Sequence, residues 1–117
     1  MMKIIHYNEV GSVHYDNDAA RSVDGRVVIG KADGARNFCM RVFEIGPGGY
    51  TPFHKHAWEH EIFFHEGSGE VYRDGEWIPV TSGSVAFIPD KEEHQIKNVS
   101  SEPLIFVCLV PREAPEL

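Results

Sequence analysis

Residues 48–67 read GGYTPFHKHAWEHEIFFHEG, and this stretch determines how the rest of the chain is interpreted. It places His54, His56 and His60 within seven positions. Two residues that lie two positions apart on a β-strand point to the same face, so His54 and His56 are predicted to be neighbours. The three residues before His60 allow a bend into a return strand, which would bring a third imidazole to the same place. Neutral imidazole is a common transition-metal ligand, so the stretch indicates a site for one ion.

A fourth histidine, His94, lies in the later segment 89–98, PDKEEHQIKN. Together the two regions resemble the two sequence motifs of the cupin family. The first motif, G-(x)5-H-x-H-(x)3,4-E-(x)6-G, corresponds to Gly48–Gly67. The second, G-(x)5-P-x-G-(x)2-H-(x)3-N, corresponds to Gly83–Asn98. Because both motifs keep the family's spacing, the resemblance is specific, and it implies a metal-site core over residues 48–98.

The chain departs from the family pattern at two positions. His60 stands where the family usually has glutamate, so the resemblance implies four histidine ligands, His54, His56, His60 and His94. That set is similar to the small four-histidine, manganese-binding cupins. It implies one divalent transition metal per chain, manganese first, with iron, zinc or nickel as alternatives. Lys91 replaces a glycine of the second motif, so the turn either does not need a positive φ or contains a lysine that tolerates one.

Two alternatives concern the neighbours of His60. The zincin pattern H-E-x-x-H fails, because the next histidine is His65, and a segment rich in Ile and Phe favours a strand over a helix. Regular alternation would place Ile62 and Phe64 on the face of His60, and Glu61 and His65 on the other face. Glu61 replaces His60 as the ligand only if a bulge shifts the register.

Composition narrows the class of protein. The 117 residues fit one domain over 1–117, and the net charge of −7 argues against nucleic acid or an anionic membrane surface as a partner. No apolar run approaches the roughly 20 residues of a membrane helix, and the first residues do not form a signal peptide, so we expect a cytoplasmic protein. Cys39 and Cys108 lie in apolar runs and are expected to be reduced and buried.

Short apolar segments between Gly, Pro and Asp turns, with no helical period, predict an all-β sandwich or barrel. The cupin resemblance narrows this to a jelly-roll β-barrel. Residues 8–22 are expected to form a loop and 46–49 a tight turn. The expected strands are residues 3–7, 26–30, 38–45, 51–56, 60–65, 70–73, 76–80, 85–88, 95–99 and 104–110.

Several side chains outside the motifs have two interpretations. Arg41 and Glu44 interrupt a strand, which favours a solvated edge or an ion pair over a position inside a cavity. Phe64 could line a pocket but is expected to be core, and Arg41 or Tyr72 could present polar groups to a substrate. His6 and His14 belong to neither motif and are expected at the surface.

The expected partners are a small molecule and a second copy of the chain. An unpaired leading strand over residues 3–7 would favour a homodimer, because an open edge needs cover and twofold assemblies are common. The site favours a metal-dependent dioxygenase, isomerase or lyase acting on a small polar or anionic molecule. The alternative is a binding module without catalysis.

Overall fold

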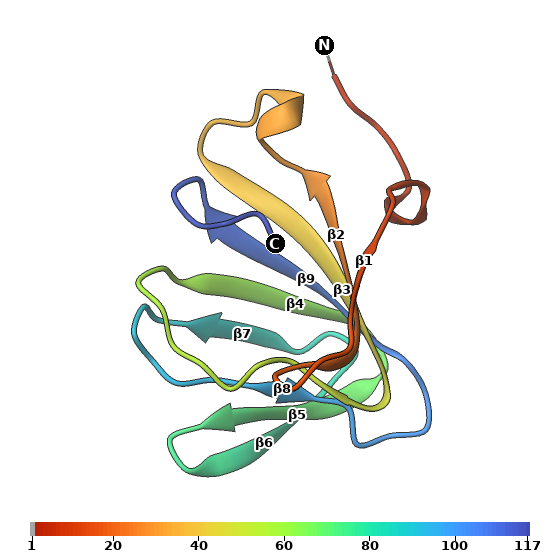
Figure 1. Ribbon diagram of the computed structural model, residues 1–117, viewed down its shortest axis with the longest axis vertical. Helices are drawn as coiled ribbons and strands as arrows, with labels where there is room; N and C mark the ends of the chain where they lie inside the picture. Colours follow the sequence, from red (N-terminus) through yellow and green to blue (C-terminus); the bar gives the residue numbers. More distant parts are fainter. Residues whose placement is uncertain (1) are drawn as a thin grey trace.

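In the computed structural model, which describes residues 2–117, nine strands form one antiparallel sheet that curls on itself (Figure 1). The order is β6-β5-β8-β3-β9-β4-β7, and β2 joins β3 to β1. The strands are β1 Val13–Tyr15, β2 Arg21–Ile29, β3 Phe38–Tyr50, β4 His60–Glu66, β5 Ser68–Arg73, β6 Glu76–Thr81, β7 Val85–Ile88, β8 Ile96–Lys97 and β9 Leu104–Pro111. Two 3-10 helices, η1 Tyr7–Glu9 and η2 Lys31–Asp33, complete the fold. This architecture confirms the predicted all-β jelly roll.

Alternating burial along β4 determines which side chains reach the interior. His60, Ile62 and Phe64 are buried, and the residues between them are exposed. The predicted alternation is therefore confirmed. Phe64 is fully buried, and its ring centroid lies 5.5 Å from that of Phe106, so it belongs to the core.

Apolar side chains fill the interior of the curled sheet and one patch of its outer surface. The interior cluster is built mainly from β3, β4 and β9, and its most deeply buried members are Ile45, Phe64, Leu104, Phe106 and Val110, at 0–2% exposure. The outer cluster contains Val28, Val42 and Ile105. No helix in residues 2–117 is long and apolar enough to cross a membrane.

The N-terminal segment differs from its prediction. Residues 3–6 form no strand, and Tyr7 begins η1, so the expected leading strand is wrong. Lys3 Nζ instead donates hydrogen bonds to the carbonyl oxygen of Val28 (2.9 Å) and to Asp33 Oδ1 (2.8 Å). Tyr7 packs on the outer apolar cluster. The segment thus packs its side chains against the sheet and does not add a hydrogen-bonded strand to it.

Three further boundaries differ from expectation. The supposed loop 8–22 contains β1, which pairs with β2. The supposed turn 46–49 is part of β3, because pairing with β2 and β8 overrides the local turn preference of its glycines. Gly48 has a φ of 78°, which favours glycine, and a Cβ at Gly49 would lie 2.5 Å from the carbonyl oxygen of Arg21, so Gly49 requires it. Residues 51–56 are an irregular segment rather than a strand.

The two motif regions are joined by a backbone bridge between His54 and His94. The His54 amide donates to the His94 carbonyl (3.2 Å), and the His94 amide donates to the His54 carbonyl (3.0 Å). Asn98 extends the link, because its amide donates to Gly49 and its carbonyl accepts from the Gly48 amide. The buried Asn98 side chain also donates to the Ile45 carbonyl at 2.9 Å. The bridge therefore holds the two histidine-bearing segments side by side.

Lys91 adopts a left-handed conformation with a φ of 64°, and its amide donates to the His56 carbonyl at 2.6 Å. The second alternative for this turn, a lysine that tolerates positive φ, is therefore confirmed.

We predict that Lys91→Gly stabilises the protein by about 0.5–1 kcal/mol, because relief of left-handed strain outweighs the added freedom of the unfolded chain. Thermal unfolding should show a rise in Tm of about 4 °C. Lys91→Ala is the matched control, since it removes the charge but keeps Cβ, and it should leave Tm unchanged. Equal Tm values for both variants would contradict the strain explanation.

Candidate metal centre

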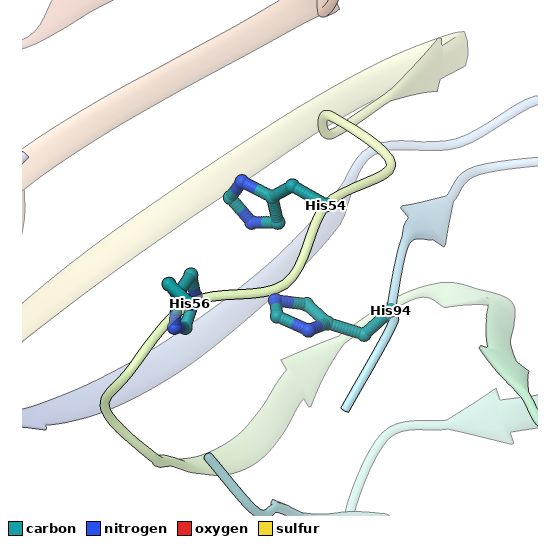
Figure 2. Close-up of side chains that lie close together, drawn as sticks. All are labelled: His54, His56 and His94. Carbon is teal, nitrogen blue, oxygen red and sulfur yellow. The ribbon is translucent and has the colours of Figure 1, made fainter. Parts of the chain in front are cut away.

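Three of the predicted histidines converge on one point inside the curled sheet (Figure 2). His54 and His56 lie on the segment between β3 and β4, and His94 lies just before β8. Each of the three can offer a ring nitrogen such that all the nitrogens lie within 4.8 Å of one another. The ring centroids are 4.7–5.0 Å apart. Such spacing suits three nitrogen ligands around one ion.

The fourth histidine, His60, enters from the first position of β4. Its Nε2 lies 2.9 Å from Nε2 of His56, and its ring centroid lies 5.1 Å from that of His94. Glu61 is exposed on the opposite face, and the irregularity of β4 falls later, between Phe64 and Glu66. The structure thus brings all four predicted residues together, and their role as ligands stays a prediction.

Hydrogen bonds determine where two of the imidazoles carry their protons. Nδ1 of His56 lies 2.9 Å from the Trp58 carbonyl oxygen, and Nδ1 of His94 lies 2.9 Å from the Glu92 carbonyl oxygen. A carbonyl oxygen can only accept, so each Nδ1 carries a proton and donates. Nε2 of both rings is therefore unprotonated and keeps its lone pair. Bonds of this kind orient histidine ligands in metal sites.

His60 has a different environment. Its Nδ1 lies 3.4 Å from Nη2 of Arg41 and 3.2 Å from Sγ of Cys108. A guanidinium can only donate, so Nδ1 of His60 is the acceptor and its proton lies on Nε2, directed at His56. A metal at Nε2 of His60 would have to displace that proton.

Arg41 is buried, and the favoured expectation of a solvated edge or ion pair is wrong for it. It lies on the inner face of β3 with an exposure of 7%, whereas Glu44 is exposed. Its Nη2 donates to Cys108 Sγ at 2.9 Å, and its guanidinium lies 4.9 Å from the centre of the Phe43 ring. Cys108 is buried, as predicted, but its position beside Arg41 and His60 was not foreseen.

These groups line a cavity of about 240 Å³. Arg41, Cys108 and three of the histidines lie in its wall, and Tyr72 does not. The β1–β2 connection contributes residues that carried no recognisable signal in the sequence. The remaining lining is mostly apolar and includes Ala20, Val23, Phe43, Ile62, Ile96 and Phe106. His6 and His14 are exposed outside the cluster, as expected.

Burial keeps the histidine cluster neutral. It lowers the pKa of His60 to about 3, helped by the charge of Arg41. Burial also lowers the pKa of His54 to about 4, with a further contribution from His94, and it lowers the pKa values of His56 and His94. At neutral pH all four rings are therefore uncharged, which metal binding requires.

Comparison with known proteins gives consistent results. The family model described as Cupin domain matches residues 41–110. The polyketide cyclase RemF from Streptomyces resistomycificus superimposes with a TM-score of 0.91 at 34% identity, covering 98% of this chain and 82% of that one.

Several relatives carry functional names, and two of them match different shares of this chain. The 1-methylthio-D-xylulose 5-phosphate methylsulfurylase of Rhodospirillum rubrum is 29% identical over 116 residues, covering 97% of this chain and 70% of that protein. The oxalate-binding protein of Thermotoga maritima is 31% identical over 68 residues, covering 57% of this chain and 56% of that protein. The second match thus spans little more than half of each protein.

The lowered pKa of His60 predicts that the metal-free protein loses stability in acid. The unfolded chain protonates this histidine below pH 6.5, whereas the folded chain does so only near pH 3. The stabilisation present above pH 6.5 is therefore lost as the pH falls. His60 alone should lower the free energy of unfolding by about 3 kcal/mol between pH 6.5 and pH 4.

Urea unfolding of the metal-free protein at several pH values measures this effect. His60→Leu should flatten the pH dependence, and His6→Gln, a change at an exposed histidine, should leave it as it is. A wild-type slope equal to that of His60→Leu would contradict the assignment.

Proposed function

This chain belongs to the cupin domain family, and from that premise we propose that it is a metalloenzyme that binds a small polar or anionic substrate at one divalent transition metal. The observation that carries the proposal is the convergence of neutral imidazoles beside a cavity. We propose a reaction of the dioxygenase, isomerase or lyase type, because each needs a metal with open coordination positions.

We propose His54, His56, His60 and His94 as the ligands and manganese as the metal. The donor set fits a metal, because His56 and His94 keep Nε2 unprotonated while Nδ1 of each ring donates to a carbonyl oxygen. Imidazole also suits zinc, iron and nickel, so the choice of manganese rests on the resemblance to four-histidine cupins. When bound, the metal would act as a Lewis acid with its full charge, since histidines contribute no negative charge.

The chain's own residues orient the imidazoles and surround them with apolar side chains. The His56 ring stacks on Trp58 with 4.2 Å between centroids and 8° between planes, which restrains the plane of the imidazole. The carbonyls of Trp58 and Glu92 set the ring orientations of His56 and His94. The apolar lining leaves few positions for water, so charges inside the cavity interact more strongly than in solvent.

A binding module without catalysis is the second candidate. The relative named as an oxalate-binding protein favours it. Oxygen consumption and product analysis with catechols, diketones and keto acids distinguish the two. Turnover that requires the metal supports the enzyme, and saturable binding of a compound that is recovered unchanged supports the module.

We also propose a homodimer, now through the outer face of β4 and β7. Phe63, Val85 and Phe87 lie on this face with exposures of 50%, 76% and 60%. Phe63 and Val85 are directly paired across the two strands, which makes the apolar surface continuous. A second copy would remove it from water.

Metal analysis of variants tests the ligand set. Wild-type protein should hold one metal per chain, His56→Ala should lose it, and His60→Ala should bind it more weakly. His60→Glu should retain the metal, because a carboxylate can replace the imidazole, while an anionic ligand binds less tightly. His14→Ala is the control at an exposed histidine.

Glu61→Ala distinguishes the two strand registers. It should leave metal content unchanged, because Glu61 points away from the cluster. Full metal content in His60→Ala together with loss in Glu61→Ala would overturn the four-histidine set.

Light scattering during size-exclusion chromatography tests the assembly. We expect twice the chain mass of 13.2 kDa at micromolar concentration. The double variant Val85→Ser, Phe87→Ser should be monomeric, and Val99→Ser, at an exposed position outside the strands, should remain a dimer. A monomeric wild-type protein would refute the proposal.

A further inference from the structure

Arg41 is a buried cation that no carboxylate neutralises. Its exposure is 7%, and none of the ion pairs in residues 2–117 includes it. In the same part of the chain its Nε is buried without a hydrogen-bond partner, and the guanidinium's hydrogen bonds run only from Nη2, to Cys108 and His60. Burial of an unpaired charge is strongly unfavourable, so this position requires a functional explanation.

The surroundings of Arg41 restrain it at the wall of the cavity. The Phe43 ring supports the guanidinium from one side at 4.9 Å, and the Cys108 sulfur holds Nη2 at 2.9 Å. The guanidinium lines the same cavity as His54, His60 and His94. An anion in the cavity would supply the missing counter-charge and accept charge-assisted hydrogen bonds.

The rest of the lining limits the chemical class of that anion. Arg41 is the only lysine or arginine in the wall of the cavity, and the other rings that could carry charge are neutral histidines. Thr51 Oγ1 already bonds the Ile96 backbone, and Asn17 Oδ1 accepts from the amides of Ala19 and Ala20. Besides the histidines and Cys108, the wall then offers the Asn17 amide nitrogen and the Tyr15 hydroxyl as polar groups. Few groups remain to bind a polyhydroxylated sugar.

We propose that Arg41 binds the carboxylate of a small monocarboxylic acid with an apolar body, and holds that body against the apolar wall beside the histidines. The volume of about 240 Å³ lies below the roughly 300 Å³ of the smallest typical ligand pockets, so the acid is small. This inference deepens the proposed function, because the same cavity adjoins the candidate metal centre.

Calorimetric titration with benzoate, and with benzamide as its neutral counterpart, tests the inference on metal-free and manganese-treated protein. Wild type should bind benzoate at least tenfold more tightly than benzamide in both forms. Arg41→Met should remove that preference while metal content stays unchanged. Arg41→Lys, which keeps the charge without the planar fork, should retain part of it and serves as a second variant should the first unfold. Arg36→Met, at an exposed arginine, is the matched control.

The outcomes separate this inference from the proposed function. Arginine-dependent benzoate binding in protein that takes up no metal would support the inference and refute the metal proposal. Benzoate binding that needs manganese and survives Arg41→Met would overturn the inference and leave the metal proposal intact. No benzoate binding, or tighter binding of inorganic phosphate than of benzoate, would also overturn it.

Discussion

The structure of the site depends on the backbone bridge between His54 and His94. Neither residue lies in a named strand, so two reciprocal backbone hydrogen bonds join these segments in place of a longer ladder. The bridge is reinforced at one end by Asn98, which pairs with Gly48 and Gly49, and at the other by the Lys91 amide on the His56 carbonyl. Three imidazoles from two distant segments are thereby held within reach of a common ion.

The four histidines are not equivalent. His56 and His94 are oriented by backbone carbonyls, which keep Nε2 unprotonated, whereas His60 faces a guanidinium, which keeps Nδ1 unprotonated. The same guanidinium helps to lower the pKa of His60. The site therefore has two parts. The unprotonated Nε2 atoms of His56 and His94 suit a metal ion, and the Arg41 guanidinium suits an anion. His60 lies between them and contacts both.

The sequence predicted those parts of the structure that repeat with a fixed period. The alternation of β4 was predicted correctly, because a strand with one buried face leaves a clear pattern. The His54-Lys55-His56 segment was mistaken for a strand, because a spacing of two is equally compatible with an irregular segment. The turn predicted at 46–49 was wrong. The glycines favour a turn locally, but they carry no information about the pairing of β3 with β2 and β8. The sequence did contain a sign that Arg41 is buried, since Arg41 lies on the same strand face as Cys39 and Phe43. Its charge nevertheless favoured the prediction of a solvent-exposed position.

The placement of the histidines on irregular segments has an evolutionary consequence. Residues 51–59 and 89–95 lie outside the β3–β9 and β4–β9 ladders, so substitutions there that keep the His54–His94 bridge leave the scaffold intact. Drift in these segments alters donor atoms and pocket shape while the scaffold persists. His60 is different, because it occupies the first position of a core strand and pairs with Ile88. Lineages that share this barrel should thus diverge in chemistry first along the two connecting segments, and only rarely through insertions at position 60.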